Sequence, residues 1–152
     1  MPAQPLFRDV AELLPHAAPM ILIDEVTDWG EGFLEARVAH AAPSLFALDD
    51  GSVPAWVGIE YMAQAIGAYA GIRARRRGEP VRIGFLLGAR EYAARVPYFR
   101  PRQVVTVRVE SIFRDEAEIA AFDCEIRDGG TLLAKAEVKA VQPDNPEDVF
   151  AT

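Results

Sequence analysis

The sequence predicts an α+β fold in which an antiparallel sheet of five to six strands wraps around one long central helix. Three features support this prediction. An almost uncharged apolar stretch lies at residues 53–72, two short strand-like segments precede it, and several alternating segments follow it. The length of 152 residues, with 51% hydrophobic and 26% charged residues, is typical of one globular domain with a substantial core. We therefore expect a single domain over residues 1–152, with a flexible tail from about residue 142.

The chain before the apolar stretch is expected to contain a short helix, two strands and a loop. The signals are apolar residues at helical spacing, strand-forming residues and closely spaced glycines. A proline ends the helix because its ring cannot continue the hydrogen-bond pattern. The expected elements are a helix at residues 7–14 ended by Pro15, strands at 20–28 and 33–40 joined at Gly30 and Gly32, and an irregular loop at 41–52.

The apolar stretch itself is expected to form a helix that is buried in the core. Pro54 suits a first helical turn, and apolar residues then lie on all sides of the helix. Several arginines followed by Gly78 form the C-terminal signal, because cations complement the helix dipole and glycine often ends a helix. A membrane span is the alternative on length alone. Glu60 and Gln64, in the middle of the stretch, argue against it.

The second half of the chain has the alternating pattern of antiparallel strands. Pro97 and Pro101 mark a break between the first of these strands and the others, and the sequence Asp128-Gly129-Gly130 is a strong hairpin signal. A single sheet leaves edge strands uncovered, which favours pairing with a second subunit. The expected strands are residues 82–90, 104–113, 118–126 and 131–141.

Charge is unevenly distributed along the chain. The net charge of −7 argues against general nucleic-acid binding. Residues 71–102, however, contain nine arginines and only two glutamates. This basic segment is either a docking site for an anionic partner or simply a solvated helix end and sheet rim. The arginines at the end of the helix are the candidates for partner binding: Arg73, Arg75, Arg76 and Arg77.

The cysteine and histidine content excludes some classes of site. The single Cys124 excludes an internal disulfide and suggests a reducing compartment. Two separated histidines and one cysteine do not make a metal site, and we expect no metal and no bound cofactor. The N-terminal segment lacks the features of a signal peptide, so the cytoplasm is the expected location.

Glu60 is the strongest candidate for a functional residue. A carboxylate is costly to bury unless another group pairs with its charge or donates a hydrogen bond to it. Gln64 lies four residues further on, hence on the same face of the helix, where it can hold the carboxyl group in place. The alternative is a buried carboxyl group that the backbone or Gln64 satisfies without any chemistry. For the neighbouring Trp56 and Tyr61 the alternative is plain core packing, although Trp56 is also a candidate for lining a substrate tunnel.

Several segments resemble the (3R)-hydroxyacyl-acyl carrier protein dehydratases. Residues 13–24 (LLPHAAPMILID) resemble the opening "LLPHRxPxLLLD" of that family, and residues 59–64 (IEYMAQ) resemble its helix motif "xExMAQ". Pro54 matches the proline of the "PGV" turn, and residues 95–102 (RVPYFRPR) resemble "FxRPVxPGD". The likeness covers roughly residues 10–140. It implies the hotdog fold, a dimer with sites at the subunit interface, and a substrate carried on the phosphopantetheine arm of an acyl carrier protein.

In this family a histidine and a helix carboxylate perform the chemistry. The histidine, in a "GHFP" motif on the loop before the helix, removes the α-proton of the thioester, a role that suits its pKa. By resemblance, Glu60 helps expel the β-hydroxyl as water, since a carboxyl group in an apolar pocket can supply a proton. Backbone N–H groups at the helix start, here near Ala55 and Trp56, are expected to polarise the thioester carbonyl.

The loop of this chain departs from the family pattern because it contains no "GHFP". The histidine position corresponds to Phe46, or to Leu48 if the loop is shorter. His16 matches a non-catalytic position of the family, whereas His40, at the end of the second predicted strand, is a weak candidate for the base. Paired aspartates before a glycine, here Asp49 and Asp50, usually make a turn and are equally weak candidates. Residues 54–64 (PAWVGIEYMAQ) resemble dehydratase-like proteins of aryl-polyene-type gene clusters that also lack this histidine.

Three functions remain open from the sequence. The first is a 3-hydroxyacyl-carrier-protein dehydratase, or the dehydratase-like half of a pair, acting in fatty acid or aryl-polyene-type polyketide biosynthesis. The second is a hotdog thioesterase that uses Glu60 alone. The third is a non-catalytic subunit that stabilises a complete dehydratase or docks the carrier protein. The expected partners are an acyl carrier protein and either a second copy of the chain or a histidine-bearing hotdog dehydratase, with no nucleic acid and no membrane.

Overall fold

The structure is a computed structural model, and it describes residues 21–40, 45–79, 85–114 and 119–141. Within these ranges it contains one long helix and two antiparallel sheets. The helix expected at residues 7–14, His16 and the tail from residue 142 lie outside the described residues. The strands are β1 (Glu25–Gly30), β2 (Phe33–Val38), β3 (Val53–Pro54), β4 (Phe85–Ala94), β5 (Tyr98–Phe99), β6 (Val105–Arg114), β7 (Ile119–Asp128) and β8 (Thr131–Val141).

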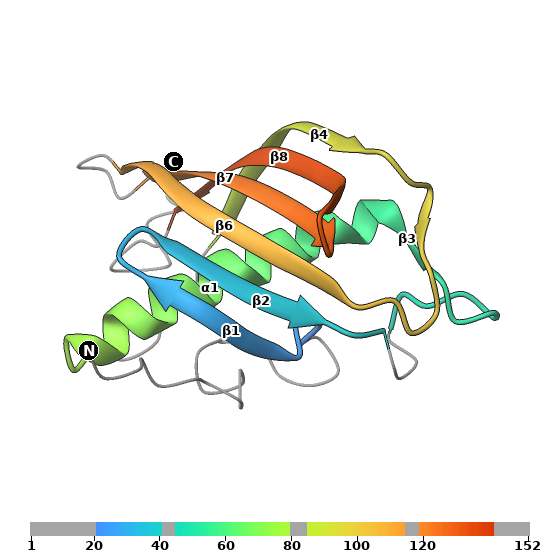
Figure 1. The fold of residues 1–152 in the computed structure, drawn as a ribbon. Helices are drawn as coiled ribbons and strands as arrows, with labels where there is room; N and C mark the ends of the chain where they lie inside the picture. Colours follow the sequence, from blue (N-terminus) through green and yellow to red (C-terminus); the bar gives the residue numbers. More distant parts are fainter. Residues whose placement is uncertain (1–20, 41–44, 80–84, 115–118, 142–152) are drawn as a thin grey trace.

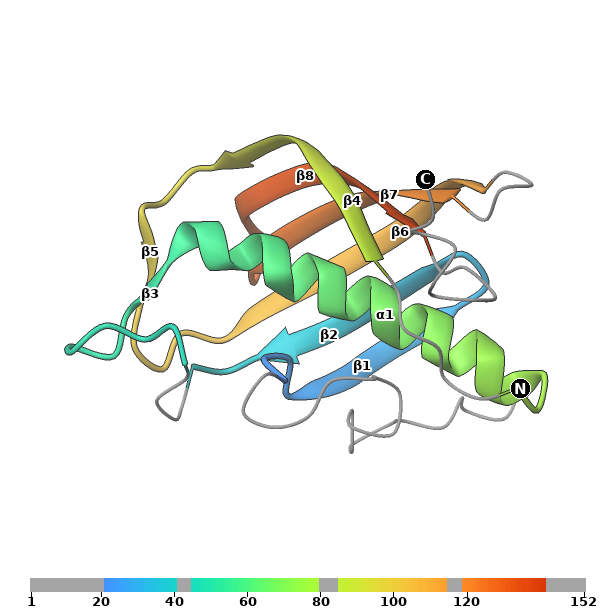
Figure 2. The same ribbon diagram turned by 180° about the vertical axis from the view of Figure 1, so that it is seen from behind.

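The larger sheet has six strands in the order β1-β2-β6-β7-β8-β4, and every neighbouring pair is antiparallel. It curves around the helix, which lies along its concave side (Figures 1 and 2). This arrangement confirms the expected hotdog fold. The hairpin predicted at residues 128–130 joins β7 to β8, and Gly129 has the positive φ of +57° that such a turn favours.

The central helix consists of a short 3₁₀ helix, η2 (Ala55–Val57), that continues directly into α1 (Gly58–Arg76). Its end matches the predicted signal. Gly78 has a φ of +71°, and the N–H of Glu79 donates to the carbonyl of Ala74, which is how a glycine stop satisfies the last turn. No helix within the described ranges is long and apolar enough to cross a membrane.

The core lies between α1 and the concave face of the sheet. Alternate residues of each strand point toward the helix, as the period of two requires. Apolar side chains of the helix meet them, which explains why this helix is apolar on several sides. The most fully buried of these core residues include Leu34, Tyr61, Met62, Ile72, Val107, Val109, Ile126 and Val138.

Two short strands that the sequence pattern did not predict hold the start of the helix. β3 immediately precedes η2, and it pairs with β5, so that Val53 lies opposite Phe99 and Pro54 opposite Tyr98. The predicted break around Pro97 therefore contains a strand. Because β3 and β5 are joined to η2 and β4, they fix where the helix begins relative to the large sheet (Figure 2).

Candidate active site

Glu60 lies in the first turn of α1 and contacts Gln64 as the spacing predicted. The side-chain amide of Gln64 donates to Oε1 of Glu60 over 3.2 Å. The other end of the Gln64 side chain accepts a hydrogen bond of 2.7 Å from the backbone N–H of Leu22. Gln64 is fully buried, so both bonds are shielded from water. The half-buried carboxyl group of Glu60 is thus held by a side chain that is itself fixed to the backbone before β1.

His40 lies two residues beyond β2 and contacts the helix next to Glu60. Its Nδ1 lies 2.6 Å from the carbonyl oxygen of Gln103, and its Nε2 lies 2.8 Å from the hydroxyl of Tyr61. A carbonyl can only accept, so Nδ1 carries the proton and Nε2 accepts from the Tyr61 hydroxyl. The ring also stacks on Phe99 at 5.5 Å between centroids. Both ring nitrogens are therefore engaged within this chain, an arrangement that favours a structural role for His40.

The loop before the helix places an aromatic residue, not a base, at the position expected for the family histidine. Phe46 is half-buried and makes an edge contact with Trp56 at 5.8 Å between ring centroids. Trp56 itself is 61% exposed, so it does not line a tunnel within this single chain. Asp50 accepts hydrogen bonds from the N–H and the hydroxyl of Ser52, which lower its pKa and hold a turn.

The start of the helix offers one backbone donor rather than the expected pair. The N–H of Ala55 donates to the carbonyl of Pro97 over 2.9 Å, so in this structure it is already engaged within the chain. The N–H of Trp56, the second residue of η2, is one of the groups that a helix start leaves without an intrahelical acceptor. No acceptor for it lies among the residues that the structure describes.

The structure adds Tyr92, which the sequence analysis missed. Its hydroxyl donates to the carbonyl of Ala55 over 2.5 Å. Tyr92 lies in β4, 37 residues from Ala55, and the alternating pattern alone does not show which face of that strand it occupies. A signal was nevertheless present in Gly58, because a glycine in the first turn of a buried helix often marks the close approach of another side chain.

The arginine cluster lies at the opposite end of the helix from Trp56. Arg75, Arg76 and Arg77 are exposed, and Arg73 is half-buried. Two of them lie over aromatic rings, Arg73 over Tyr69 and Arg76 over Trp29. At 1.5 Å per residue, about 30 Å separates the cluster from the start of the helix (Figure 2). Within this chain the structure therefore does not bring the candidate docking site and the candidate catalytic site together.

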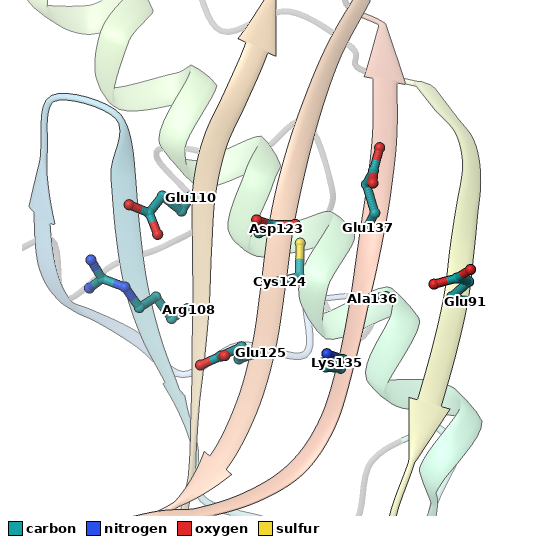
Figure 3. Close-up of a pocket in the computed structure, with 9 residues that line it drawn as sticks. All are labelled: Glu91, Arg108, Glu110, Asp123, Cys124, Glu125, Lys135, Ala136 and Glu137. Atoms are coloured by element: carbon teal, nitrogen blue, oxygen red, sulfur yellow. The ribbon is translucent and has the colours of Figure 1, made fainter.

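A hollow of about 330 Å³ lies on the convex face of the sheet, with α1 behind the sheet (Figure 3). Charged side chains from β4, β6, β7 and β8 line it, and no candidate catalytic residue does. It is thus separate from Glu60. Within the described ranges, no group of three or more histidine, cysteine, aspartate or glutamate side chains is arranged to hold a metal ion.

The chain is similar to known proteins in both sequence and structure. The model of the ApeP-like family, described as ApeP dehydratase, matches residues 8–151. Among solved structures, the dehydratase heterocomplex ApeI:P from Xenorhabdus doucetiae matches with a TM-score of 0.86 and 32% identity, over 93% of this chain and 94% of that chain.

More distant structures share the fold alone. Cj0977, a sigma28-regulated virulence protein from Campylobacter jejuni, has a TM-score of 0.62 and 12% identity, over 90% of this chain and 88% of that chain. A hypothetical thioesterase with coenzyme A from Streptococcus pneumoniae has a TM-score of 0.60 and 12% identity, over 78% of this chain and 84% of that chain. No functionally curated protein matched the sequence.

Proposed function

This chain belongs to the ApeP-like dehydratase family, and on that premise we propose that it is one half of a heteromeric dehydratase. Its substrates are 3-hydroxyacyl thioesters on the phosphopantetheine arm of an acyl carrier protein, in fatty acid or aryl-polyene-type polyketide biosynthesis. Glu60 is the catalytic acid. A histidine-bearing hotdog subunit supplies the base.

The observation that carries this proposal is the anchored carboxyl group of Glu60. Gln64 holds it at 3.2 Å, and Leu22 fixes Gln64 in turn. A catalytic group works best when its own orientation is set by a second layer of contacts, because no reorganisation is then needed during the reaction. A glutamate that merely covered the surface would not require a fully buried amide to orient it.

The base is assigned to a partner because His40, the histidine in the described part of this chain, is already engaged at both ring nitrogens. The loop at residues 41–52 contains no histidine. His40 donates through Nδ1 and accepts through Nε2, so it would have to lose the Tyr61 hydrogen bond before it took a proton from substrate. The similar ApeI:P structure is a dehydratase heterocomplex, which supports a two-subunit arrangement here.

The proposed reaction is an elimination in which the partner's histidine removes the α-proton of the substrate. The electron pair of that C–H bond forms the α,β double bond, and the C–O bond at the β-carbon breaks. The carboxylic acid of Glu60 gives its proton to the departing hydroxyl, which leaves as water. Proton exchange between the histidine and Glu60 then restores both groups.

The N–H of Trp56 completes the proposed site by hydrogen bonding to the thioester carbonyl. Negative charge develops on that oxygen as the α-proton leaves, so a fixed donor there stabilises the transition state more than the ground state. Phe46, from the loop before the helix, makes an edge contact with the Trp56 ring. The acidic carrier protein docks on the basic cluster of Arg73, Arg75, Arg76 and Arg77, through charge complementarity.

The test is mass spectrometry of a 3-hydroxyacyl-carrier-protein incubated with this chain, with a histidine-bearing subunit, or with both. We expect loss of one water only from the mixture, and a rate about 100-fold lower with Glu60→Gln, the size typical for removal of a general acid. Glu110→Gln, the same change on the exposed outer face, is the control and should have no effect. Full activity of the partner alone would contradict the proposal, and release of the free acid would identify a thioesterase instead.

A further inference from the structure

We propose that Tyr92 is a positioning residue that orients the backbone N–H of Trp56 toward the substrate carbonyl. This inference rests on the proposed function, since it concerns the donor that polarises the thioester. It adds a residue from the far edge of the sheet to a site that otherwise comes from the helix start. Four features of the described residues carry it.

The first feature is an irregularity in β4 that points Tyr92 at the helix. Two residues of β4, Glu91 and Tyr92, occupy the space opposite one residue of β8, so the ladder contains a β-bulge. Glu91 has a φ of +55°, a conformation that costs free energy for a residue other than glycine. A bulge re-aims the side chain beside it, and here it directs the half-buried Tyr92 toward η2.

The second feature is the absence of a side chain at Gly58, which leaves room in the first turn of α1 for the Tyr92 hydroxyl. A Cβ atom built at Gly58 would collide with the Tyr92 hydroxyl and would lie only 2.7 Å from Cδ1 of Ile126. Only glycine therefore lets the hydroxyl reach the carbonyl of Ala55. The glycine in the helix and the bulge in the strand both make room for this contact, which distinguishes it from an incidental surface hydrogen bond.

The third feature is the geometry of the peptide unit that Tyr92 holds. The carbonyl of Ala55 and the N–H of Trp56 belong to the same peptide bond, which is planar, and they point in opposite directions. The carbonyl of Ala55 also accepts from the N–H of Gly58, so the Tyr92 hydroxyl is its second donor. The hydroxyl approaches from β4, outside the helix, and the two bonds together fix the direction of the Trp56 N–H. The N–H of Ala55, on the preceding peptide unit, is tied to Pro97, so the backbone on both sides of Ala55 is held.

The fourth feature is that the hydrogen bond also strengthens the donor. An O–H bound to the carbonyl of a peptide polarises that unit, and its N–H becomes a better donor. Burial raises the pKa of Tyr92 to about 12, so its hydroxyl keeps its proton at any working pH. The chain of contacts thus runs from Tyr92 through the Ala55–Trp56 peptide to the site of the thioester oxygen.

The experiment compares Tyr92→Phe with Tyr69→Phe in the full-length chain. Tyr69 is the matched control, because its hydroxyl also makes one hydrogen bond to backbone, from the N–H of Gly32 over 3.2 Å, but it lies about two and a half turns along the helix from Glu60. The first readout is the backbone amide resonance of Trp56 in the nuclear magnetic resonance spectrum. The second is the split between kcat and KM for dehydration by the chain together with its histidine-bearing partner.

We expect Tyr92→Phe to shift the Trp56 amide resonance and to lower kcat about tenfold, the loss expected for one hydrogen bond, with KM changed less than about twofold. Tyr69→Phe should leave both readouts unchanged. An unaltered Trp56 resonance, or an altered one with normal kcat, would overturn this inference alone. A wild-type complex that dehydrates nothing would instead overturn the proposed function, and the Trp56 resonance would still show whether Tyr92 orients that peptide.

Discussion

His40 illustrates how one buried contact couples the site to pH. Burial lowers the pKa of its imidazole below the ordinary value of 6.5, and this effect outweighs the carbonyl of Gln103 and the charge of Asp24, which both act to raise it. The folded chain therefore binds a proton at His40 less readily than the unfolded chain does. Protonation would also turn Nε2 into a donor and break its acceptance of the Tyr61 hydroxyl.

The first prediction follows from the sign of that shift. Above about pH 6.5 the imidazole is neutral in both states, and its full contribution to stability is present. As the pH falls through the lowered pKa of the folded state, the unfolded state binds more protons and stability is lost. Thermal unfolding of the wild type between pH 8 and pH 5 should show this decline.

The comparison for this prediction is His40→Asn. Asparagine tolerates the left-handed backbone conformation that His40 adopts, with a φ of +50°, but does not titrate in this range. We expect the variant to be less stable at pH 8 and to lose less stability on acidification than the wild type. Parallel curves for the two proteins would show that His40 does not contribute to the pH dependence.

At the scale of secondary structure, the sequence predicted the presence of every element that has a clear period within the described residues. The strand expected at 20–28 is shifted, however, because β1 begins only at Glu25 and extends to Gly30. The alternation of polar and apolar residues located β6, β7 and β8 to within two residues, and β8 matched at both ends. β4 was placed about four residues too early at its end, because its bulge interrupts the alternation there. β3 and β5 were missed because two residues cannot show a period.

The difference between a local periodic pattern and a contact between distant elements also explains which site residues the sequence predicted. Glu60 and Gln64 are four residues apart on one helix, so their contact follows from helical geometry alone. The contacts of His40 with Tyr61 and of Tyr92 with Ala55 join residues 21 and 37 positions apart, on different elements. They depend on how the sheet curves around the helix, which no local pattern in the sequence contains.

The second prediction concerns the first turn of α1. Gly58→Ala would normally favour a helix by about 1 kcal/mol. Here the added methyl group would meet the hydroxyl of Tyr92 and Cδ1 of Ile126, so we expect a net loss of about 1–3 kcal/mol in the free energy of unfolding. Denaturant unfolding measures this loss.

A double variant separates the two collisions at Gly58. Tyr92→Phe removes the nearest atom but leaves Ile126 in place. Gly58→Ala should therefore destabilise the protein less in the Tyr92→Phe background than in the wild type. If Gly58→Ala instead stabilises the wild-type protein, the first turn has more room than the structure indicates, and the close fit of Tyr92 is wrong.

Across the whole molecule, the convex face of the sheet carries two contrasting rows of charge (Figure 3). In one row, Glu110, Asp123 and Glu137 are directly opposite one another on β6, β7 and β8. In the neighbouring row, Glu125 lies between Arg108 and Lys135. Like charges directly opposite destabilise a sheet, whereas opposite charges stabilise it. The two rows therefore act in opposite senses on the stability of the same sheet.

The third prediction compares one variant from each row, so that each variant serves as the control for the other. Asp123→Asn removes the central charge of the acidic row and should stabilise the protein by about 0.2–1 kcal/mol. Glu125→Gln removes a charge from between two cations, and also from its 2.9 Å ion pair with Arg127, and should destabilise the protein by a similar amount. Both effects should shrink at high salt, because exposed charges are screened. Thermal unfolding at low and high salt measures them, and equal signs for the two variants would contradict the argument.

The distribution of charge also predicts how the acidic carrier protein proposed as a partner would approach. The basic cluster lies at the C-terminal end of α1, whereas the convex face bears the acidic row, so the field attracts an anionic partner to one end of the molecule. Arg76→Ala with Arg77→Ala should lower the association rate of the carrier protein about three- to tenfold at low salt, and much less at high salt.

Lys135→Ala with Lys139→Ala removes the same number of positive charges from the exposed convex face, and should have a smaller effect. Stopped-flow binding distinguishes the two pairs. An equal loss from both would mean that only net charge matters and that the end of the helix is not the docking site.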